Sequence, residues 1–280
     1  MRILALLLTL AAACLTGCES LTDVLKNAPR PSARIVGASL HDLSLERVDL
    51  LFDVEVTNPY PTTLPLTDLS YSVASAGQTI AEGGVKPASA IPARGSKVLQ
   101  IPAGIRFSSL MSALKSVRPG SVVPYNADFK LAVDAPVVGL MTIPLSHQGE
   151  LPVPAVPDVT MTSFDVGALS LDKVEAIARM RVKNTNQFDV DIARLGFNLV
   201  LGGQQVAGTS VTNGGKLVPG QEGTIAVPLS FSPKEFGIGL FNLLRGSESS
   251  YSVFGSLETD TRFGALKLPF DRKGNARISR

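Results

Sequence analysis

The sequence predicts a mainly β protein built from two tandem β-sandwiches, each with one short α-helix. Three observations favour this fold: apolar residues alternate with polar ones, turn-forming residues separate these runs, and a long internal repeat aligns the two halves. The 280 residues include 25 Gly and 19 Pro, which is typical of many short strands joined by turns. A chain of this length accommodates one large domain or two ordinary ones.

The repeat is clearest in two hexapeptides. Residues 43–48 read LSLERV and residues 169–174 read LSLDKV, an offset of 126 residues (169 minus 43). The same offset places Asn58 on Asn184 and Tyr125 on Tyr251, and Pro144 aligns with Pro269 after a slip of one residue. Solenoid repeats have periods of up to about 50 residues, so this longer repeat indicates a duplicated domain.

We therefore expect a first copy over residues 33–150 and a second copy over residues 159–280. Between them, residues 151–158 read LPVPAVPD, with proline at alternate positions. Proline fixes φ and removes a backbone donor. This composition predicts a stiff, extended linker.

Alternation predicts the strands. Every second residue from Val48 to Val56 is apolar, and Val174 to Val182 repeats the pattern. A period of two indicates a strand with one buried face, as in a sandwich. Weaker strands are expected around residues 68–74, 97–101, 126–133 and 141–146, with counterparts in the second copy. The pairs Gly202-Gly203 and Gly214-Gly215 are expected in hairpin turns.

One helix is predicted near the end of each copy. Ser232-Pro233-Lys234-Glu235 has the form of a capping box, and Gly246 is placed to end the helix. In the first copy we expect the helix to begin at Ser108 or Ser109 and to stop at Pro119-Gly120. The apolar stripes are Leu110, Met111, Leu114 and Val117 in the first copy, and Phe236, Leu240, Phe241 and Leu244 in the second.

Two interpretations of these stripes are open. The favoured one is packing of each helix against its sandwich. The alternative is an apolar groove between helix and sheet that takes an acyl chain. The candidate groove residues are Leu110, Leu114, Val117, Phe236, Leu240, Phe241 and Leu244.

The N-terminus has the parts of a secretory signal peptide. Arg2 supplies a positive charge, residues 3–15 are apolar, and small residues precede Cys18. The apolar stretch is too short to span a bilayer comfortably. A small residue directly before a cysteine resembles the bacterial lipoprotein signal. That resemblance implies cleavage after residues 1–17, lipidation of Cys18 and a tether over residues 18–32. An ordinary secretory signal with an incidental cysteine is the alternative.

The lipoprotein resemblance also implies a location. Glu19 is not the Asp associated with retention at the inner membrane, so in a host with two membranes we expect an outer-membrane lipoprotein facing the periplasm. It would contact the membrane through its N-terminal lipid. The only other cysteine, Cys14, lies in the signal. The mature chain would therefore form no internal disulfide.

The end of the first alternating strand carries a motif. Residues 56–60 read VTNPY and residues 182–186 read VKNTN. An alternating strand followed by Val-x-Asn-Pro-Asn and an apolar pair resembles the late embryogenesis abundant type 2 family, also called the water stress and hypersensitive response domain. Neither copy keeps the full Asn-Pro-Asn, since Tyr60 and Thr185 replace one residue each. The apolar pairs are Leu64 with Leu66 and Val190 with Ile192.

The family resemblance implies a sandwich like a fibronectin type III or immunoglobulin domain, with no known catalytic residues. It also implies an association with dehydration and other stress, through protection of proteins or membranes, and some relatives bind lipid. Asparagine hydrogen-bonds its own backbone two residues on, and proline fixes φ for a turn. We interpret the motif as a structural turn made by Asn58, Pro59, Tyr60, Asn184, Thr185 and Asn186.

Signals for chemistry are weak. The chain has 26 basic and 24 acidic residues, 6% aromatics and no Trp, so we expect no nucleic-acid partner. His41 and His147 lack a second ligand at metal-binding spacing and are interpreted as solvated or strand-end residues. No G-x-S-x-G or P-loop motif is present. We therefore expect no metal, no cofactor and no enzymatic activity.

The copies differ in charge on one strand face. Asp53, Glu55 and Thr57 align with Arg179, Arg181 and Lys183. Either the two solvated faces drifted independently, or opposite charges set the register of faces that meet. Three functions are weighed: protection of proteins or membranes at the envelope, a lipid-binding or lipid-transfer module, and a structural adaptor of an envelope complex.

Overall fold

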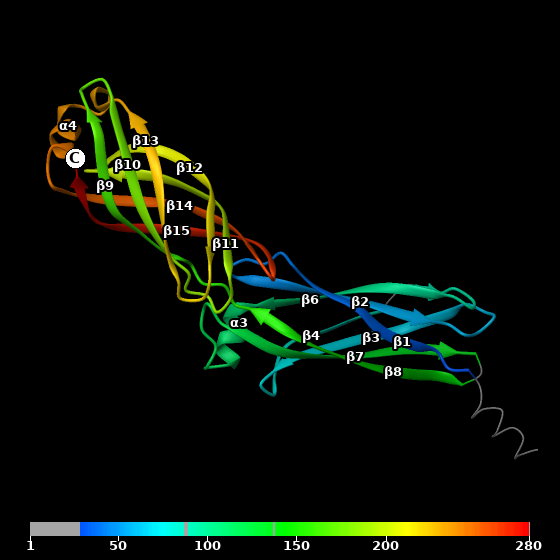
Figure 1. Ribbon diagram of the computed structural model, residues 1–280. Coiled ribbons are helices and arrows are strands. Elements are labelled where there is room, and N and C mark those ends of the chain that lie inside the picture. Colours follow the sequence, from blue (N-terminus) through cyan, green and yellow to red (C-terminus); the bar gives the residue numbers. More distant parts are fainter. Residues whose placement is uncertain (1–28, 87–88, 137, 280) are drawn as a thin grey trace, which may run out of the picture. The chain divides into compact units, whose positions relative to one another are not determined.

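A computed structural model describes residues 29–86, 89–136 and 138–279. The mainly β fold with two domains and a short helix in each is confirmed. The signal peptide with Cys18 and most of the predicted tether lie outside the described residues. Figure 1 shows the elements in chain order.

The first copy contains two sheets. One has the strand order β1 (Ser32–His41), β2 (Arg47–Thr57) and β6 (Ser96–Arg106). The other has the order β4 (Gln78–Val85), β3 (Leu64–Ser75), β7 (Val122–Ala135) and β8 (Gly139–Pro152), and the two-residue β5 (Ala90–Ile91) also pairs with β3. The helix α3 (Phe107–Ala113) follows β6 directly.

The strands of the second copy join in one sheet. Its order is β12 (Gln204–Leu217), β11 (Val190–Leu201), β14 (Glu248–Thr261), β15 (Gly264–Ser279), β9 (Asp158–Leu169), β10 (Val174–Lys183) and β13 (Glu222–Phe231). The neighbours β15 and β9 pair in parallel over three residues, Arg277 to Ser279 with Ser163 to Asp165. The 3-10 turn η1 (Pro233–Glu235) and the helix α4 (Ile238–Leu244) lie between β13 and β14.

The alternating strands bury the predicted face. In β2, Val48, Leu50, Phe52, Val54 and Val56 are at most 1% exposed. In β10, every second residue from Val174 to Val182 is buried in the same way. Because successive side chains of a strand point to opposite faces, the period of two in the sequence becomes one core face and one solvated face. The remaining strands are longer than the sequence predicts.

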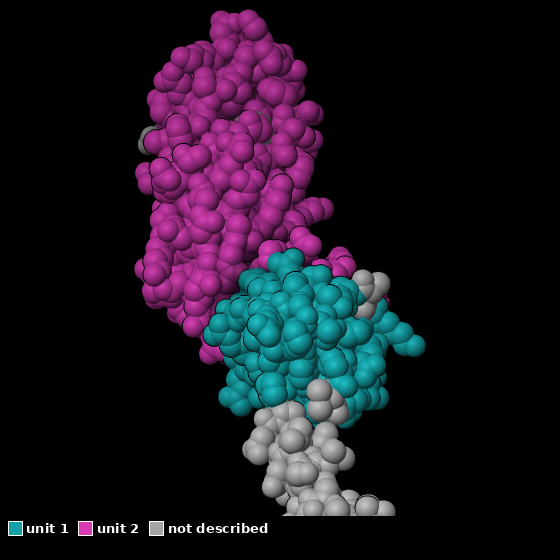
Figure 2. Space-filling model, turned by 90° about the vertical axis from the view of Figure 1, so that its right-hand side faces the viewer, with its two compact units in different colours: residues 1–39, 50–103, 125–149 teal, residues 40–49, 104–124, 150–280 magenta. Residues whose placement is uncertain are grey.

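The chain forms two compact units, coloured separately in Figure 2. One holds the described parts of residues 1–39, 50–103 and 125–149, and the other holds residues 40–49, 104–124 and 150–280. Within the second unit, Leu43, Leu45 and Val122 pack against the core of β9 to β15. Residues 153–157, which connect β8 to β9, are also packed, since Val153 is 1% and Ala155 8% exposed.

Both predicted helices are shorter than expected. α3 begins at Phe107, with Arg106 as N-cap, and ends at Ala113 instead of continuing to Pro119. The prediction of one helix capped by Ser232 is wrong. Ser232 makes no side-chain cap, its buried Oγ has no partner, and η1 is separated from α4 by Gly237 at φ 88°. Glycine adopts positive φ without strain, so it breaks the helix that the capping box predicts.

The second glycine pair was also placed wrongly. Gly202 and Gly203 form the β11–β12 turn, with φ of 55° and 86°. Gly214 and Gly215 instead lie inside β12, where the register with β11 shifts. A Cβ on Gly214 would lie 2.6 Å from Ile192 Cγ2. This pair therefore allows a bulge and a close approach of β12 to the core.

Candidate functional site

The first motif turn is held by Asn58, which is 1% exposed. Its Oδ1 accepts a hydrogen bond from the Tyr60 amide at 2.9 Å. Its Nδ2 donates to the carbonyls of Thr62 (2.8 Å) and Pro92 (2.9 Å), with a longer contact to Ile91 (3.3 Å). One amide group thus closes the turn after β2 and ties it to the segment around β5.

The second turn repeats this arrangement at Asn184, which is 2% exposed. Its Oδ1 accepts from the Asn186 amide at 2.9 Å, and its Nδ2 donates to Phe188 O (2.8 Å) and Leu217 O (3.0 Å). Every polar atom of both side chains is therefore engaged with backbone groups. A buried amide in this state stabilises the turn and has no free donor for a ligand.

Residues beside Asn184 carry contacts that the sequence did not indicate. Asn186 Oδ1 accepts from the Ala155 amide at 2.8 Å. Thr185 Oγ1 donates to Val156 O at 3.3 Å, and the Gln187 amide donates to Gly120 O at 2.7 Å. Within the second unit, the motif loop thus anchors the 153–157 segment. Thr185 and Asn186 replace the Pro59 and Tyr60 of the first turn, so these contacts need residues that only the second turn has.

The helix stripes lie mostly in the core. Leu110 and Leu244 are fully buried and Leu240 is 4% exposed; Leu114 and Val117 are each 7% exposed. In the second copy, Leu240 and Leu244 belong to the hydrophobic core, and Phe236 packs against it. Phe241 is half-buried, with the Arg245 guanidinium 6.0 Å from its ring centre. This burial favours the packing interpretation of the stripes.

The charged strand faces are paired within each unit. Glu55 binds Arg34 at 2.6 Å, and Asp53 accepts from Gln100 at 3.2 Å. In the second copy the signs are reversed: Arg179 binds Asp165 at 2.6 Å, and Lys183 lies 3.3 Å from Glu222. Each strand therefore has complementary charges on its own neighbours. Exposed pairs of this kind contribute little stability, about 0–1 kcal/mol.

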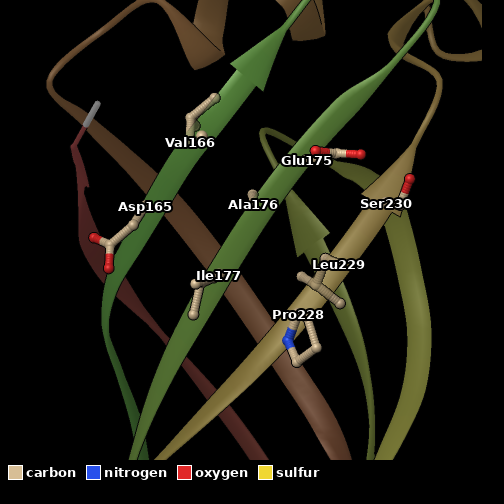
Figure 3. Close-up of a pocket in the computed structure, with 9 residues that line it drawn as sticks. Asp165, Val166, Glu175, Ala176, Ile177, Pro228, Leu229 and Ser230 are labelled. Carbon is tan, nitrogen blue, oxygen red and sulfur yellow. The ribbon is translucent and has the colours of Figure 1, made fainter.

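A shallow, open concavity of about 660 Å³ lies over β9, β10 and β13. In Figure 3, Ile177 and Pro228 lie on adjacent strands, with Asp165 on the β9 side and Glu175 farther along β10. The floor is apolar, since Ile177 is 39% exposed and Val166, Ala176 and Leu229 are at the core surface.

The pKa values of the two carboxyls at this concavity, Asp165 and Glu175, are both lowered. A hydrogen bond from Ser279, assisted by Arg179, lowers the pKa of Asp165, and Lys173 lowers the pKa of Glu175. Acid–base catalysis by two carboxyls needs environments that push their pKa values apart. Both groups favour the charged form, so this concavity resembles a solvated protein surface.

The histidines are placed differently from each other. His41 ends β1 and is exposed. His147 is half-buried inside β8, with its ring centre 5.7 Å from that of Phe52 and 6.2 Å from that of Tyr125, so it is neither the solvated nor the strand-end residue that the sequence predicts. Among the described residues, no group of three His, Cys, Asp or Glu is arranged to hold a metal. No helix in the same described part is long and apolar enough to cross a membrane.

A pair of tyrosines was missed by the sequence analysis as a structural feature. Tyr125 lies against Gly149 and Tyr251 against Gly274, where a Cβ would lie 2.6 Å and 3.1 Å from the hydroxyl oxygen. The alignment of the two copies could have found both pairs, because each Tyr and each Gly recurs. The rings cover glycines of the neighbouring strand, a known way to stabilise such positions.

Known proteins are similar to parts of this chain. The family model described as late embryogenesis abundant protein (LEA_2) matches residues 53–149 and 179–274. The desiccation protectant protein Lea14 homolog of Glycine max is 34% identical over 133 residues, which cover 48% of this chain and 88% of that protein. The late embryogenesis abundant protein Lea14-A of Gossypium hirsutum is 31% identical over 141 residues, or 50% of this chain and 93% of that protein.

A solved structure is similar as well. The solution structure of an Arabidopsis thaliana protein has 33% sequence identity and a TM-score of 0.38, and the match covers 46% of this chain and 86% of that one. The two LEA_2 matches include both asparagine turns and the strands around them, and together they cover more than half of the sequence. The chain therefore belongs to the late embryogenesis abundant family, with two tandem LEA_2 domains.

Proposed function

We propose that this chain is a lipid-anchored, non-enzymatic envelope protein that protects proteins or membranes under desiccation or other stress. The observation that carries this proposal is the tandem family match, whose relatives are named as desiccation protectant or desiccation-related proteins. Its partners would be protein clients and the membrane, with no nucleic acid. In a host with two membranes, it would face the periplasm from the outer membrane.

The described surface supports a non-enzymatic role. The motif asparagines are saturated with backbone contacts, and the two carboxyls at the shallow concavity are both held in their charged form. The remaining exposed surface carries charges of both signs, which pair with one another, as Arg34 does with Glu55. Such a surface suits weak contact with many clients rather than one reaction.

Protection is tested by drying and rehydrating a sensitive enzyme, such as lactate dehydrogenase, with or without the chain from Glu19 onward. We expect the chain to preserve clearly more enzyme activity than an equal mass of serum albumin. A parallel arm dries dye-loaded phospholipid vesicles and measures leakage, which distinguishes membrane protection from protein protection. Equal recovery with chain and albumin in both arms would reject the proposal.

Lipid anchoring rests on the sequence around Cys18 and has its own test. In cells fed an alkyne-labelled palmitate, we expect the full chain to incorporate label and to sediment with membranes. The Cys18→Ala variant should lose both properties. Label on the Cys18→Ala variant, or a soluble unlabelled wild-type chain, would contradict the anchor and would leave the protection proposal untouched.

The acyl-groove alternative has weaker support. Its candidate residues Leu110, Leu240 and Leu244 are buried in their domains, so an acyl chain would have to displace core packing. Native mass spectrometry of the chain from Glu19 onward, after incubation with phospholipid, decides this point. A stoichiometric lipid adduct that is lost in a folded Leu240→Asn variant would move the assignment to lipid binding.

A further inference from the structure

The strand β12 contains an asparagine followed by a glycine, Asn213-Gly214, and no other Asn-Gly pair occurs in the sequence. Because glycine has no Cβ, its backbone nitrogen can approach the side-chain carbonyl carbon of the preceding asparagine without a steric barrier. Asparagine loses ammonia most readily in this sequence, by attack of the following backbone nitrogen. In a folded protein, the way the backbone is held around the pair decides whether the attack can occur.

The backbone of this pair lies outside the ladder between β11 and β12. The register passes from Thr212 opposite Arg194 directly to Gly215 opposite Ile192, so the two residues 213–214 have no partner in it. On its other side, β12 ends the seven-stranded sheet. The pair therefore forms a bulge on an edge strand, where the chain departs from regular pairing.

The conformation of this bulge also differs from that of a strand. Asn213 has φ 58° and Gly215 has φ 86°, in the left-handed region that asparagine and glycine tolerate. Asn213 is exposed, and within the described ranges no hydrogen bond or ion pair holds its side chain. The side-chain amide is therefore accessible to water and can turn toward the Gly214 nitrogen.

Packing explains why a glycine follows this asparagine. A Cβ on Gly214 would lie 2.6 Å from Ile192 Cγ2 and 3.1 Å from Ile225 Cδ1, and both isoleucines belong to the hydrophobic core of the second copy. A larger residue would have to displace these core side chains. The fold thus requires the residue that makes Asn213 reactive.

We propose that Asn213 is a site of spontaneous deamidation in the folded chain. The Gly214 backbone nitrogen bonds to Asn213 Cγ, the bond from Cγ to the side-chain nitrogen breaks, and the proton of the Gly214 amide leaves with the ammonia. The product is a cyclic succinimide. Water then adds to either carbonyl of this ring and opens it, which gives aspartate or isoaspartate. Water is the only co-reactant, and nothing is oxidised or reduced.

The two products act differently on β12. Aspartate keeps the length of the main chain and tolerates the left-handed conformation, so it only adds a negative charge. Isoaspartate carries the main chain through the former side chain and lengthens it by one carbon. Because Gly214 is fitted closely against Ile192, we expect the longer backbone to shift the bulge and to loosen the pairing of β11 with β12.

Asn275 on β15 is the matched comparison. It is exposed as well, but it lies within the ladder, opposite Ser250, and is followed by Ala276, which is 3% exposed. Its deamidation requires local opening of paired strands, and the Cβ of Ala276 hinders the attack. We therefore expect Asn213 to deamidate at least about tenfold faster than Asn275 in the folded chain.

The test follows the full chain during incubation in mildly alkaline buffer made with oxygen-18 water. Peptide mapping by mass spectrometry, after digestion in ordinary water, measures aspartate and isoaspartate at each asparagine. We expect both products at residue 213, each with one heavy oxygen, which distinguishes them from deamidation during digestion. Asn213→Gly, which suits the left-handed φ, should remove the fast phase of ammonia release, and Asn275→Ala should leave it unchanged.

Three results would overturn the proposal. The first is a smaller ratio between the rates at Asn213 and Asn275 than the one expected above. The second is reaction of Asn213 only after unfolding in urea, because the folded bulge would then block ring closure. The third is an unchanged fast phase in Asn213→Gly. None of these measurements involves drying, a client protein or a membrane, so this proposal and the proposed function fail separately.

Discussion

Replacing Asn58 by alanine is the sharpest test of the turn. The change removes the acceptor of the Tyr60 amide and the donor to the Thr62 and Pro92 carbonyls, at a site that is 1% exposed. Each lost hydrogen bond costs about 0.5–1.5 kcal/mol, and a buried group left unpaired costs about 1–3 kcal/mol. Allowing for partial relaxation and entry of water, we expect a loss of about 3–5 kcal/mol.

This loss is large compared with the about 5–15 kcal/mol that stabilises a typical domain. The chain has two units, so a single global unfolding curve is not assured to be two-state. Native-state hydrogen exchange reads each region separately. We expect amides of β2 near Val54 and Val56 to exchange about 10²- to 4 × 10³-fold faster, since about 1.4 kcal/mol corresponds to a factor of ten.

Asn58→Asp separates the two ends of the side chain. It keeps an acceptor for the Tyr60 amide but places an oxygen opposite the Thr62 and Pro92 carbonyls, so at neutral pH it should be at least as destabilising as alanine. The matched control is Asn275→Ala on the exposed face of β15, with a change within about 0.5 kcal/mol. A less than tenfold change for Asn58→Ala would refute the reasoning, because the turn would then not depend on this amide.

Three further predictions concern the second unit. Gly120 has φ 92°, and a Cβ there would lie 2.5 Å from Thr185 O. Hydrogen-exchange measurements should therefore show a clearly larger loss of stability for Gly120→Ala than for the control Gly220→Ala, where φ is 76° and the surrounding space is open. Tyr251→Phe leaves the buried Met161 amide unpaired and should cost about 1–3 kcal/mol, whereas Tyr125→Phe should cost less; equal losses in urea unfolding would contradict the difference between the copies. Ser279→Ala should raise the pKa of Asp165 toward its ordinary value of 3.8, because Ser279 is the main cause of its lowering. A carboxyl whose folded pKa is lowered stabilises the native state above its unfolded pKa and loses this contribution as pH falls through the folded pKa. As the pH is lowered, the Ser279→Ala variant should therefore begin to unfold near β9 at a higher pH than the wild-type chain. An unchanged carbon-13 titration of Asp165 would contradict this prediction.

Much of the fold was predictable because it rests on local patterns. The alternation from Val48 to Val56 directly predicts a buried face, and the repeat of this pattern at Val174 predicts a second domain. The Asn58 turn was accessible for the same reason, since the side chain bonds the amide two residues on. These features depend on residues close in sequence, where propensity and period are informative.

Features that depend on distant partners were not predictable in the same way. The capping box at Ser232 is a local signal, but Gly237 interrupts the helix where the chain packs against the sandwich. The sequence predicts a turn at Gly214, but the structure shows that this glycine allows a close approach to Ile192. The bond from Ala155 to Asn186 joins residues 31 positions apart, and no period or spacing in the sequence indicates it.

Comparison of the two copies separates what the fold requires from what each copy is free to change. Both keep the buried asparagine, the tyrosine over a glycine and the edge proline at Pro102 and Pro228. The strand charges reverse sign, and each copy pairs them with neighbouring residues of its own, Arg34 with Glu55 in the first copy and Asp165 with Arg179 in the second. Because exposed pairs contribute little, such reversals cost little and carry no information about function.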